Sequence, residues 1–264
     1  MVFEIVENRR KKIAREKEIT SMRALVKSPY FGSECVSLKN ALVQKNQSGI
    51  IAEFKRKSPS EGILNANAEV QETTKNYMTN GASALSILTE FDYFQGSSED
   101  LTKARKANSC SILRKDFIVD EYQIIQTKSL GADAVLLIAA CLEKQELKNL
   151  YDLAKSIGLE VLFEIHDEKE LEKLPGNDLL IGVNNRNLKT MQVDLKTSID
   201  LAEKLSKEFV LVSESGIRSA EDIQLLKAVG YSGFLMGTHF MKTPNPPETL
   251  EKLIANLQKE TLCK

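Results

Sequence analysis

Charged side chains stand inside an otherwise apolar stretch, Ile-Ile-Ala-Glu-Phe-Lys-Arg-Lys-Ser-Pro-Ser at residues 50–60. A strand interior rarely accepts an unpaired charge, because removing the charge from water is costly. Side chains alternate along a strand, so Ile51, Glu53 and Lys55 share one face. If that face points into a barrel, Glu53 and Lys55 meet at the carboxyl end of the strand, where barrel enzymes build their active sites. Charges gathered at the end of a barrel strand indicate chemistry rather than packing.

A lysine and a glutamate at the ends of two further apolar runs could exchange protons with a substrate. Lys115 follows Ser-Ile-Leu-Arg at 111–114, and its ammonium can donate a proton if burial or neighbouring cations lower its pKa. An ion pair with Asp116 is the alternative. Glu164 ends an apolar run at 160–163, where burial is expected to raise its pKa and suit it to general-base work. We expect His166 to point the other way, at the start of the next helix, in a structural role.

Other apolar runs also end in polar side chains, namely Glu90, Asn184, Arg186 and Glu214. Any one of them could simply face solvent. Because strand ends of a parallel barrel meet at one edge, so many polar ends favour a shared pocket over a solvated rim.

Two small-residue turns after the last two apolar runs predict a phosphate site. They are Ser215-Gly216 and Gly237-Thr238. Small residues let backbone N–H groups approach an anion, and helix N-termini behind them add a favourable dipole. Each turn alone is a weak signal, but the two together indicate a ligand that carries a phosphate.

Apolar residues near the strand ends could form walls for an aromatic group. Such residues are equally typical of a core, and both interpretations stay open. The candidates are Pro59, Phe91, Phe94, Phe117, Leu136 and Leu188.

Eight short apolar runs alternate with helical patterns from residue 49 onward, which predicts a (β/α)8 TIM barrel. A doubly wound sheet is the rival fold, but its usual glycine-rich fingerprint is absent. We expect one domain over 1–264, with a helical extension at 1–46 and the barrel at 47–264. The predicted strands are 49–54, 83–88, 111–114, 133–138, 160–165, 178–183, 209–213 and 232–236, and predicted helices include 2–27, 37–45, 143–158 and 219–230.

Composition excludes several classes of protein. The 36 basic and 37 acidic residues give a formal net charge of −1, so no overall field favours nucleic acid or an anionic membrane. Four scattered cysteines, Cys35, Cys110, Cys141 and Cys263, and two histidines make a metal site improbable and suggest reduced thiols. The charged N-terminus is no secretory signal. We expect a cytoplasmic protein.

Taken together, these motifs resemble the indole-3-glycerol-phosphate synthase family of tryptophan biosynthesis. The resemblance runs from about residue 36 to the end. It is carried by IAEFKRKSPSEG at 51–62, LRKDFIVDEYQI at 113–124, VLFEIHD at 161–167, IGVNNRNLKTMQVDL at 181–195, VSESGI at 212–217 and GFLMGT at 233–238.

The resemblance implies the ring closure of 1-(2-carboxyphenylamino)-1-deoxyribulose 5-phosphate, with loss of CO₂ and water and with no metal or organic cofactor. By motif, Lys115 matches the family's general acid and Glu164 its general base. Ser58 and Arg186 match positions near the substrate carboxylate. The residues that match orienting roles are Glu53, Lys55, Asn184 and Glu214, and those that match the phosphate cradle are Ser215, Gly216, Gly237 and Thr238.

Some features depart from the family pattern, and two alternatives stay open. Thr238 stands where many relatives have another small or acidic residue, and the N-terminal helix matches poorly. A phosphoribosylanthranilate isomerase-like barrel would need a cysteine at a strand end, and Cys141 lies two residues too far along. A non-catalytic phosphosugar-binding protein would not need an inward Lys115 and Glu164. We expect a monomer that acts on a small phosphosugar–anthranilate compound.

Overall fold

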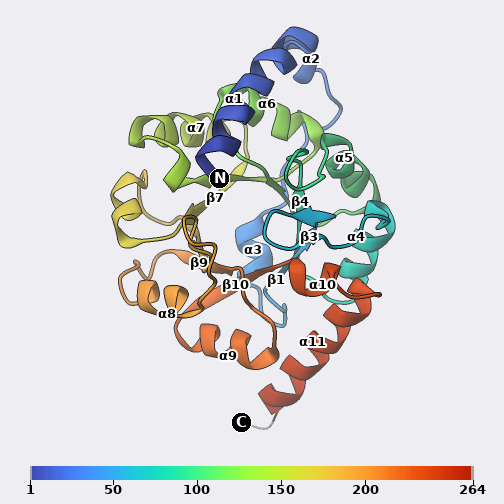
Figure 1. The fold of residues 1–264 in the computed structure, drawn as a ribbon, viewed down its shortest axis with the longest axis vertical. Helices are drawn as coiled ribbons and strands as arrows, with labels where there is room; N and C mark the ends of the chain where they lie inside the picture. The colour runs from blue at the N-terminus through green and yellow to red at the C-terminus, as the bar shows by residue number, and fades with distance from the viewer. Residues whose placement is uncertain (1, 263–264) are drawn as a thin grey trace.

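The computed structural model describes residues 2–262, and within them eight parallel strands close into a barrel (Figure 1). The predicted (β/α)8 fold is therefore confirmed. Around the barrel the strand order is β1-β10-β9-β8-β7-β6-β5-β4. The strands are β1 (Ile50–Phe54), β4 (Ala84–Leu88), β5 (Ile112–Lys115), β6 (Ala134–Ile138), β7 (Glu160–Ile165), β8 (Leu180–Asn184), β9 (Val210–Glu214) and β10 (Tyr231–Met236).

Helices cover the outside of the barrel, with one exception between β7 and β8. There the chain forms only a 3₁₀ helix, η2 (Glu168–Lys173). The other helical elements are α4 (Val70–Thr79), α5 (Ser98–Ala107), α6 (Glu121–Leu130), η1 (Ala139–Cys141), α7 (Lys144–Ser156), α8 (Lys196–Ala202), α9 (Ala220–Ala228), α10 (Thr238–Met241) and α11 (Pro246–Leu262). The start predicted for α9 is confirmed, since Ser219 caps it.

Alternation along the strands divides the core into two layers. Ile51, Leu113 and Leu162 belong to a cluster inside the barrel, whereas Ile50, Ile112 and Val161 pack between the barrel and its helices. The face of β1 that carries Ile51 and Glu53 therefore points inward, as predicted. Lys115, Asn184 and Glu214 are the last residues of their strands rather than the first residues of loops.

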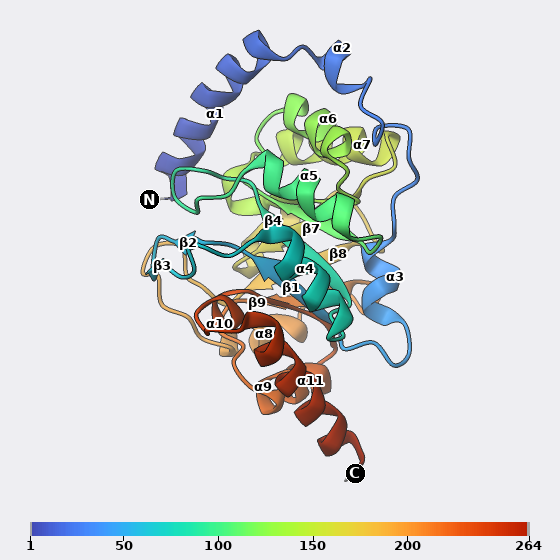
Figure 2. The same ribbon diagram turned by 90° about the vertical axis from the view of Figure 1, so that its right-hand side faces the viewer.

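The N-terminal extension reaches both ends of the barrel. Helix α3 (Leu38–Val43) closes the amino end, where Leu38 and Leu42 join the inner cluster (Figure 2). Helix α1 (Val2–Ile19) begins on the opposite side of the molecule, near the hairpin of β2 (Lys57–Ser58) and β3 (Gly62–Ile63). The single helix predicted at 2–27 is wrong in one detail, because Ser21 caps a separate short helix, α2 (Met22–Leu25).

No helix in the part of the chain from 2 to 262 is long and apolar enough to cross a membrane. Cys35, Cys110 and Cys141 are free thiols. Cys263 lies outside the described residues. Within those residues, no cluster of three or more His, Cys, Asp or Glu side chains is arranged to hold a metal ion.

Candidate active site

A cavity of about 890 Å³ opens at the carboxyl end of the barrel, and most of the candidate residues from the sequence line it. These residues come from distant parts of the chain, and the barrel closure brings them together. They are Glu53, Lys55, Ser58, Pro59, Phe94, Lys115, Phe117, Leu136, Glu164, Asn184, Arg186, Leu188, Glu214, Ser215, Gly216, Gly237 and Thr238.

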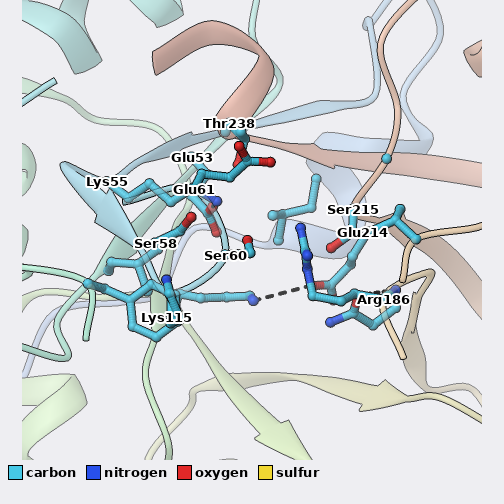
Figure 3. A pocket seen from close by; sticks show the side chains of 18 of the residues that line it. Glu53, Lys55, Ser58, Ser60, Glu61, Lys115, Arg186, Glu214, Ser215 and Thr238 are labelled. Atoms are coloured by element: carbon cyan, nitrogen blue, oxygen red, sulfur yellow. Dashed lines mark hydrogen bonds and ion pairs between the residues drawn. The ribbon is translucent and has the colours of Figure 1, made fainter. Parts of the chain in front are cut away.

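Lys115 reaches across the cavity toward Glu214 on the opposite strand, β9 (Figure 3). Its Nζ lies 3.4 Å from Oε2 of Glu214 and 3.5 Å from Oε2 of Glu164. Burial alone would lower the pKa of Lys115, but Glu214, Glu164 and Glu53 together raise it well above its ordinary value. The condition stated for proton donation, a lowered pKa, is therefore not met, because carboxylates and not cations surround the ammonium. An ion pair with Asp116 is also absent from the contacts of Lys115, which go to the two glutamates.

Glu164 is held as a carboxylate by three polar groups. Asn184 Nδ2 donates to its Oε1 over 3.0 Å, and Lys115 and His166 lie within ion-pair distance. Burial would raise the pKa of Glu164, but Lys115, His166 and Asn184 outweigh it and hold the pKa well below its usual range. The expected raised pKa is wrong for this residue, since the sequence did not show how many donors converge on it.

Glu214 has the raised pKa that the sequence assigned to Glu164. It is buried, and neither carboxylate oxygen accepts a hydrogen bond in the described part of the chain. Burial raises its pKa to about 7; Lys115 opposes this rise, and Glu164 and Glu53 add to it. Gly182 on β8 makes room for it, because a Cβ there would lie 2.2 Å from Oε1 of Glu214.

Glu53 and Lys55 form an ion pair of 2.6 Å at the end of β1. Burial would raise the pKa of Glu53, but Lys55 and Lys115 lower it below its ordinary value. Gly237 packs directly against this glutamate, since a Cβ at residue 237 would lie 2.6 Å from its Oε1. The turn after β10 and the charged pair of β1 therefore form one continuous wall.

The turn after β9 has the backbone expected of an anion cradle. Ser215 and Gly216 both have positive φ values, 69° and 82°, a conformation that favours glycine. A Cβ at Gly216 would lie 2.5 Å from Val193. Beside this turn the cavity is lined by the cationic side chains of Arg218 and Lys242, which the sequence reasoning missed. Both follow the glycine turns by only a few residues, and that spacing could have identified them.

Most of the apolar candidates line the cavity, and the prediction is wrong for one of them, Phe91. The Phe94 and Phe117 rings are 6.4 Å apart and tilted by 38° on one side of the cavity. Phe91 is 66% exposed and does not line it. Glu90 is also not part of the pocket, because its carboxylate accepts the N–H groups of Asp92 and Tyr93 and so caps its own loop.

Helix α1 lies over the cavity, with Val2 and Ile5 in its lining. It is tied to the barrel loops by Asn8, which donates to the Tyr93 hydroxyl, and by Arg9, which pairs with Asp116 over 3.1 Å. The sequence left the place of this helix open. Its apolar spacing predicted a buried face but could not say what that face would cover.

His166 does not point away from the site, contrary to expectation. Its Nε2 lies 3.2 Å from Oε1 of Glu164, because residues 164 and 166 share a face of β7 and its extension. The neighbouring loop turns into η2, capped by Asp167, instead of starting an α-helix at His166.

Comparison with known proteins places this geometry in a family. The family model described as indole-3-glycerol phosphate synthase matches residues 2–253. The chain belongs to this family. The indole-3-glycerol phosphate synthase of Bacteroides thetaiotaomicron is 45% identical over 98% of this chain and 99% of its own length. That of Carboxydothermus hydrogenoformans is 43% identical over 95% and 98%.

Membership of the indole-3-glycerol phosphate synthase family gives the reaction. The chain is a lyase of tryptophan biosynthesis that closes the indole ring on 1-(2-carboxyphenylamino)-1-deoxyribulose 5-phosphate and releases CO₂ and water. The isomerase and binding-protein alternatives are therefore set aside. Cys141 would also serve poorly in an isomerase, because burial raises the pKa of its thiol to about 12, and Glu164 and Glu170 add to the rise.

Solved structures support the fold alone. A thiamine phosphate pyrophosphorylase from Pyrococcus furiosus matches with a TM-score of 0.60 at 15% identity, over 84% of this chain and 98% of its own. A chain of the tryptophan synthase complex from the same organism matches with a TM-score of 0.57 at 16% identity, over 81% and 99%.

Proposed function

We propose that Lys115 is the general acid and Glu164 the general base of this ring closure. The observation that carries the proposal is the position of the Lys115 ammonium, 3.5 Å from Glu164 and 3.4 Å from Glu214 in one buried pocket. As the ring carbon attacks the ribulose carbonyl, negative charge develops on its oxygen. Lys115 has a raised pKa, so it is a weak acid toward the neutral carbonyl but can protonate the forming alkoxide.

The transfer of this proton prepares the second half of the reaction. Once Lys115 is neutral, Glu164 loses the cation that contributes most to lowering its pKa. Its basicity then increases at the stage where an anilino proton must leave with water. The Lys115–Glu164 contact thus links the two proton transfers in time, and CO₂ loss between them restores the aromatic ring.

The remaining residues bind and orient the substrate. Ser58 and Arg186 hold its carboxylate, and the backbone around Ser215, Gly216, Gly237 and Thr238 holds its phosphate with the help of helix α10. Pro59, Phe94, Phe117, Leu136 and Leu188 contact the anthranilate ring. Glu53, Lys55, Asn184 and Glu214 stabilise developing charge. All of these residues line the same cavity.

We further propose that the protein is a monomer and that it acts in the cytoplasm. It consists of one domain, residues 1–264, and uses neither metal nor organic cofactor. The dispersed free thiols support the cytoplasmic part of this proposal.

Single-turnover experiments separate the two roles. CO₂ release and indole fluorescence are followed with Lys115→Met, Glu164→Gln and the exposed-lysine control Lys106→Met. We expect Lys115→Met to slow both signals by about 10²–10⁴-fold. Glu164→Gln should slow the indole signal far more than CO₂ release, because only dehydration needs the base. Lys106→Met should match the parent. If Glu164→Gln slowed CO₂ release as much as the indole signal, as Lys115→Met is expected to do, the division of roles would be contradicted.

A further inference from the structure

Behind Glu164, outside the cavity lining, lies an imidazole that the reaction scheme above does not use. His166 follows β7 directly, and Asp167 begins η2 by capping it, so the ring is held at a fixed point between strand and helix. Its side chain is 10% exposed.

Two carboxylates face the two ring nitrogens of His166. Nε2 lies 3.2 Å from Oε1 of Glu164, and Nδ1 lies 3.5 Å from Oε2 of Glu170. The same Glu170 oxygen accepts the backbone N–H of His166 over 2.8 Å, which fixes the second carboxylate against the ring. Neither ring nitrogen has a linear hydrogen bond in the described chain. The ring therefore lies between its neighbours as a cation between two anions.

We propose that His166 is a positioning residue for Glu164, an imidazolium bridged between the carboxylates of Glu164 and Glu170. The proposal rests on the role of Glu164 as general base. Asn184 and His166 both contact Oε1 of Glu164, so they hold this oxygen on one side and leave Oε2 toward Lys115 and the cavity. Glu170 acts on Glu164 through His166, because it keeps the imidazole charged and oriented.

Electrostatics agree with this arrangement. Burial would lower the pKa of His166, but the two glutamates raise it to about 10, so the ring is cationic at neutral pH. The other titratable groups that interact with Glu164 are Lys115, Glu53, Glu214 and the Cys141 thiol. His166 and Lys115 are the two cations among these groups, and only Lys115 loses its proton in the scheme above. His166 therefore keeps Glu164 ionised at the start of the reaction and holds its carboxylate in place during both proton transfers.

The pH dependence of kcat and of kcat/KM tests the proposal in His166→Asn, Glu170→Gln and the double variant. Loss of the imidazolium raises the pKa of Glu164, so His166→Asn should move the acid limb of the kcat profile upward by about one pH unit. Glu170→Gln should move it in the same direction by less. In the His166→Asn background, Glu170→Gln should add nothing, because it acts through the ring.

The control is Glu168→Gln, in the same 3₁₀ helix but exposed and paired with Lys204, and its profile should match the parent. A pH-independent loss, an unchanged profile in His166→Asn, or additive effects of the two substitutions would overturn the proposal. If His166→Asn does not fold, the profile of Glu170→Gln decides alone, and an unshifted acid limb overturns it. Failure of the base assignment itself is distinct, since Glu164→Gln would then dehydrate normally.

Discussion

Two clusters of buried charge lie on opposite faces of β5, and they are built differently. In the outer cluster, around Arg114, Asp116 accepts hydrogen bonds from Arg9, Arg114, Thr89 and the backbone of Phe117, although this residue also borders the cavity. Inside the barrel, Glu214 accepts none within the described residues and has only the Lys115 ammonium, 3.4 Å away. The difference indicates that the protein itself fills the acceptors of Asp116, whereas Glu214 keeps unfilled acceptors that a substrate can use.

The largest effect on stability is expected when a cation of the outer cluster is removed. Arg114 is fully buried and donates to Thr89, Asp116, Gln126, Thr127 and the Gln123 carbonyl. Arg114→Met should lower the free energy of unfolding by about 3–5 kcal/mol, because its partners stay buried without a donor. Urea titration measures this loss. The folded fraction should keep kcat near that of the exposed control Arg23→Met; a large fall in kcat with unchanged stability would contradict the assignment.

A smaller effect is expected in the pH dependence of the free energy of unfolding. Its sign follows from the raised pKa of Glu214. Its pKa is raised to about 7 in the folded chain, above the ordinary value of 4.5, so the folded state binds this proton more tightly. The stability it contributes is present below pH 4.5 and is lost as pH rises through 7. Relative to Glu214→Gln, the parent should therefore lose on the order of 2 kcal/mol between pH 5 and pH 8.

Parallel unfolding curves of the two proteins across this range measure that difference. The subtraction removes His166, which also titrates with a raised pKa but is present in both. A difference that stays constant with pH would show that Glu214 is ionised normally.

The smallest expected effect links the outer cluster to the pocket. Arg9 joins α1 to Asp116, and Val2 and Ile5 of the same helix line the cavity. Arg9→Met should loosen α1 and raise KM about three- to tenfold, a loss of about 1 kcal/mol, with a smaller change in kcat. Steady-state kinetics beside the exposed control Lys11→Met measure this. An unchanged KM would mean that α1 covers the cavity without help from this contact.

Much of this arrangement could be predicted from the sequence, because the alternation of side chains along a strand and the succession of strands along the chain are visible in the sequence itself. The inward face of β1, the eight strands and the convergence of Lys115, Glu164 and Glu214 follow from them. What the sequence could not give was the set of partners that each charge meets. Glu164 and Glu214 end similar apolar strands, yet their pKa values move in opposite directions, since only Glu164 gains Asn184 and His166.

The N-terminal helix shows the same limit. Arg9 and Asp116 are separated by 107 residues, and nothing in the periodicity of residues 2–19 indicates that they pair. Glu90 shows the converse, because its place at a strand end suggested the pocket, whereas its carboxylate caps the loop that follows.

The most direct test of the contrast compares two isosteric changes of buried carboxylates, Asp116→Asn and Glu214→Gln, by their free energies of unfolding at pH 8. Asp116→Asn leaves Arg114 without its anion and leaves Arg9 with Glu16 alone, so it should lose about 3–5 kcal/mol. Glu214→Gln removes a carboxylate that lacks hydrogen bonds and should be as stable as the parent or more stable, while its turnover falls. Equal losses of stability in the two variants would contradict the account.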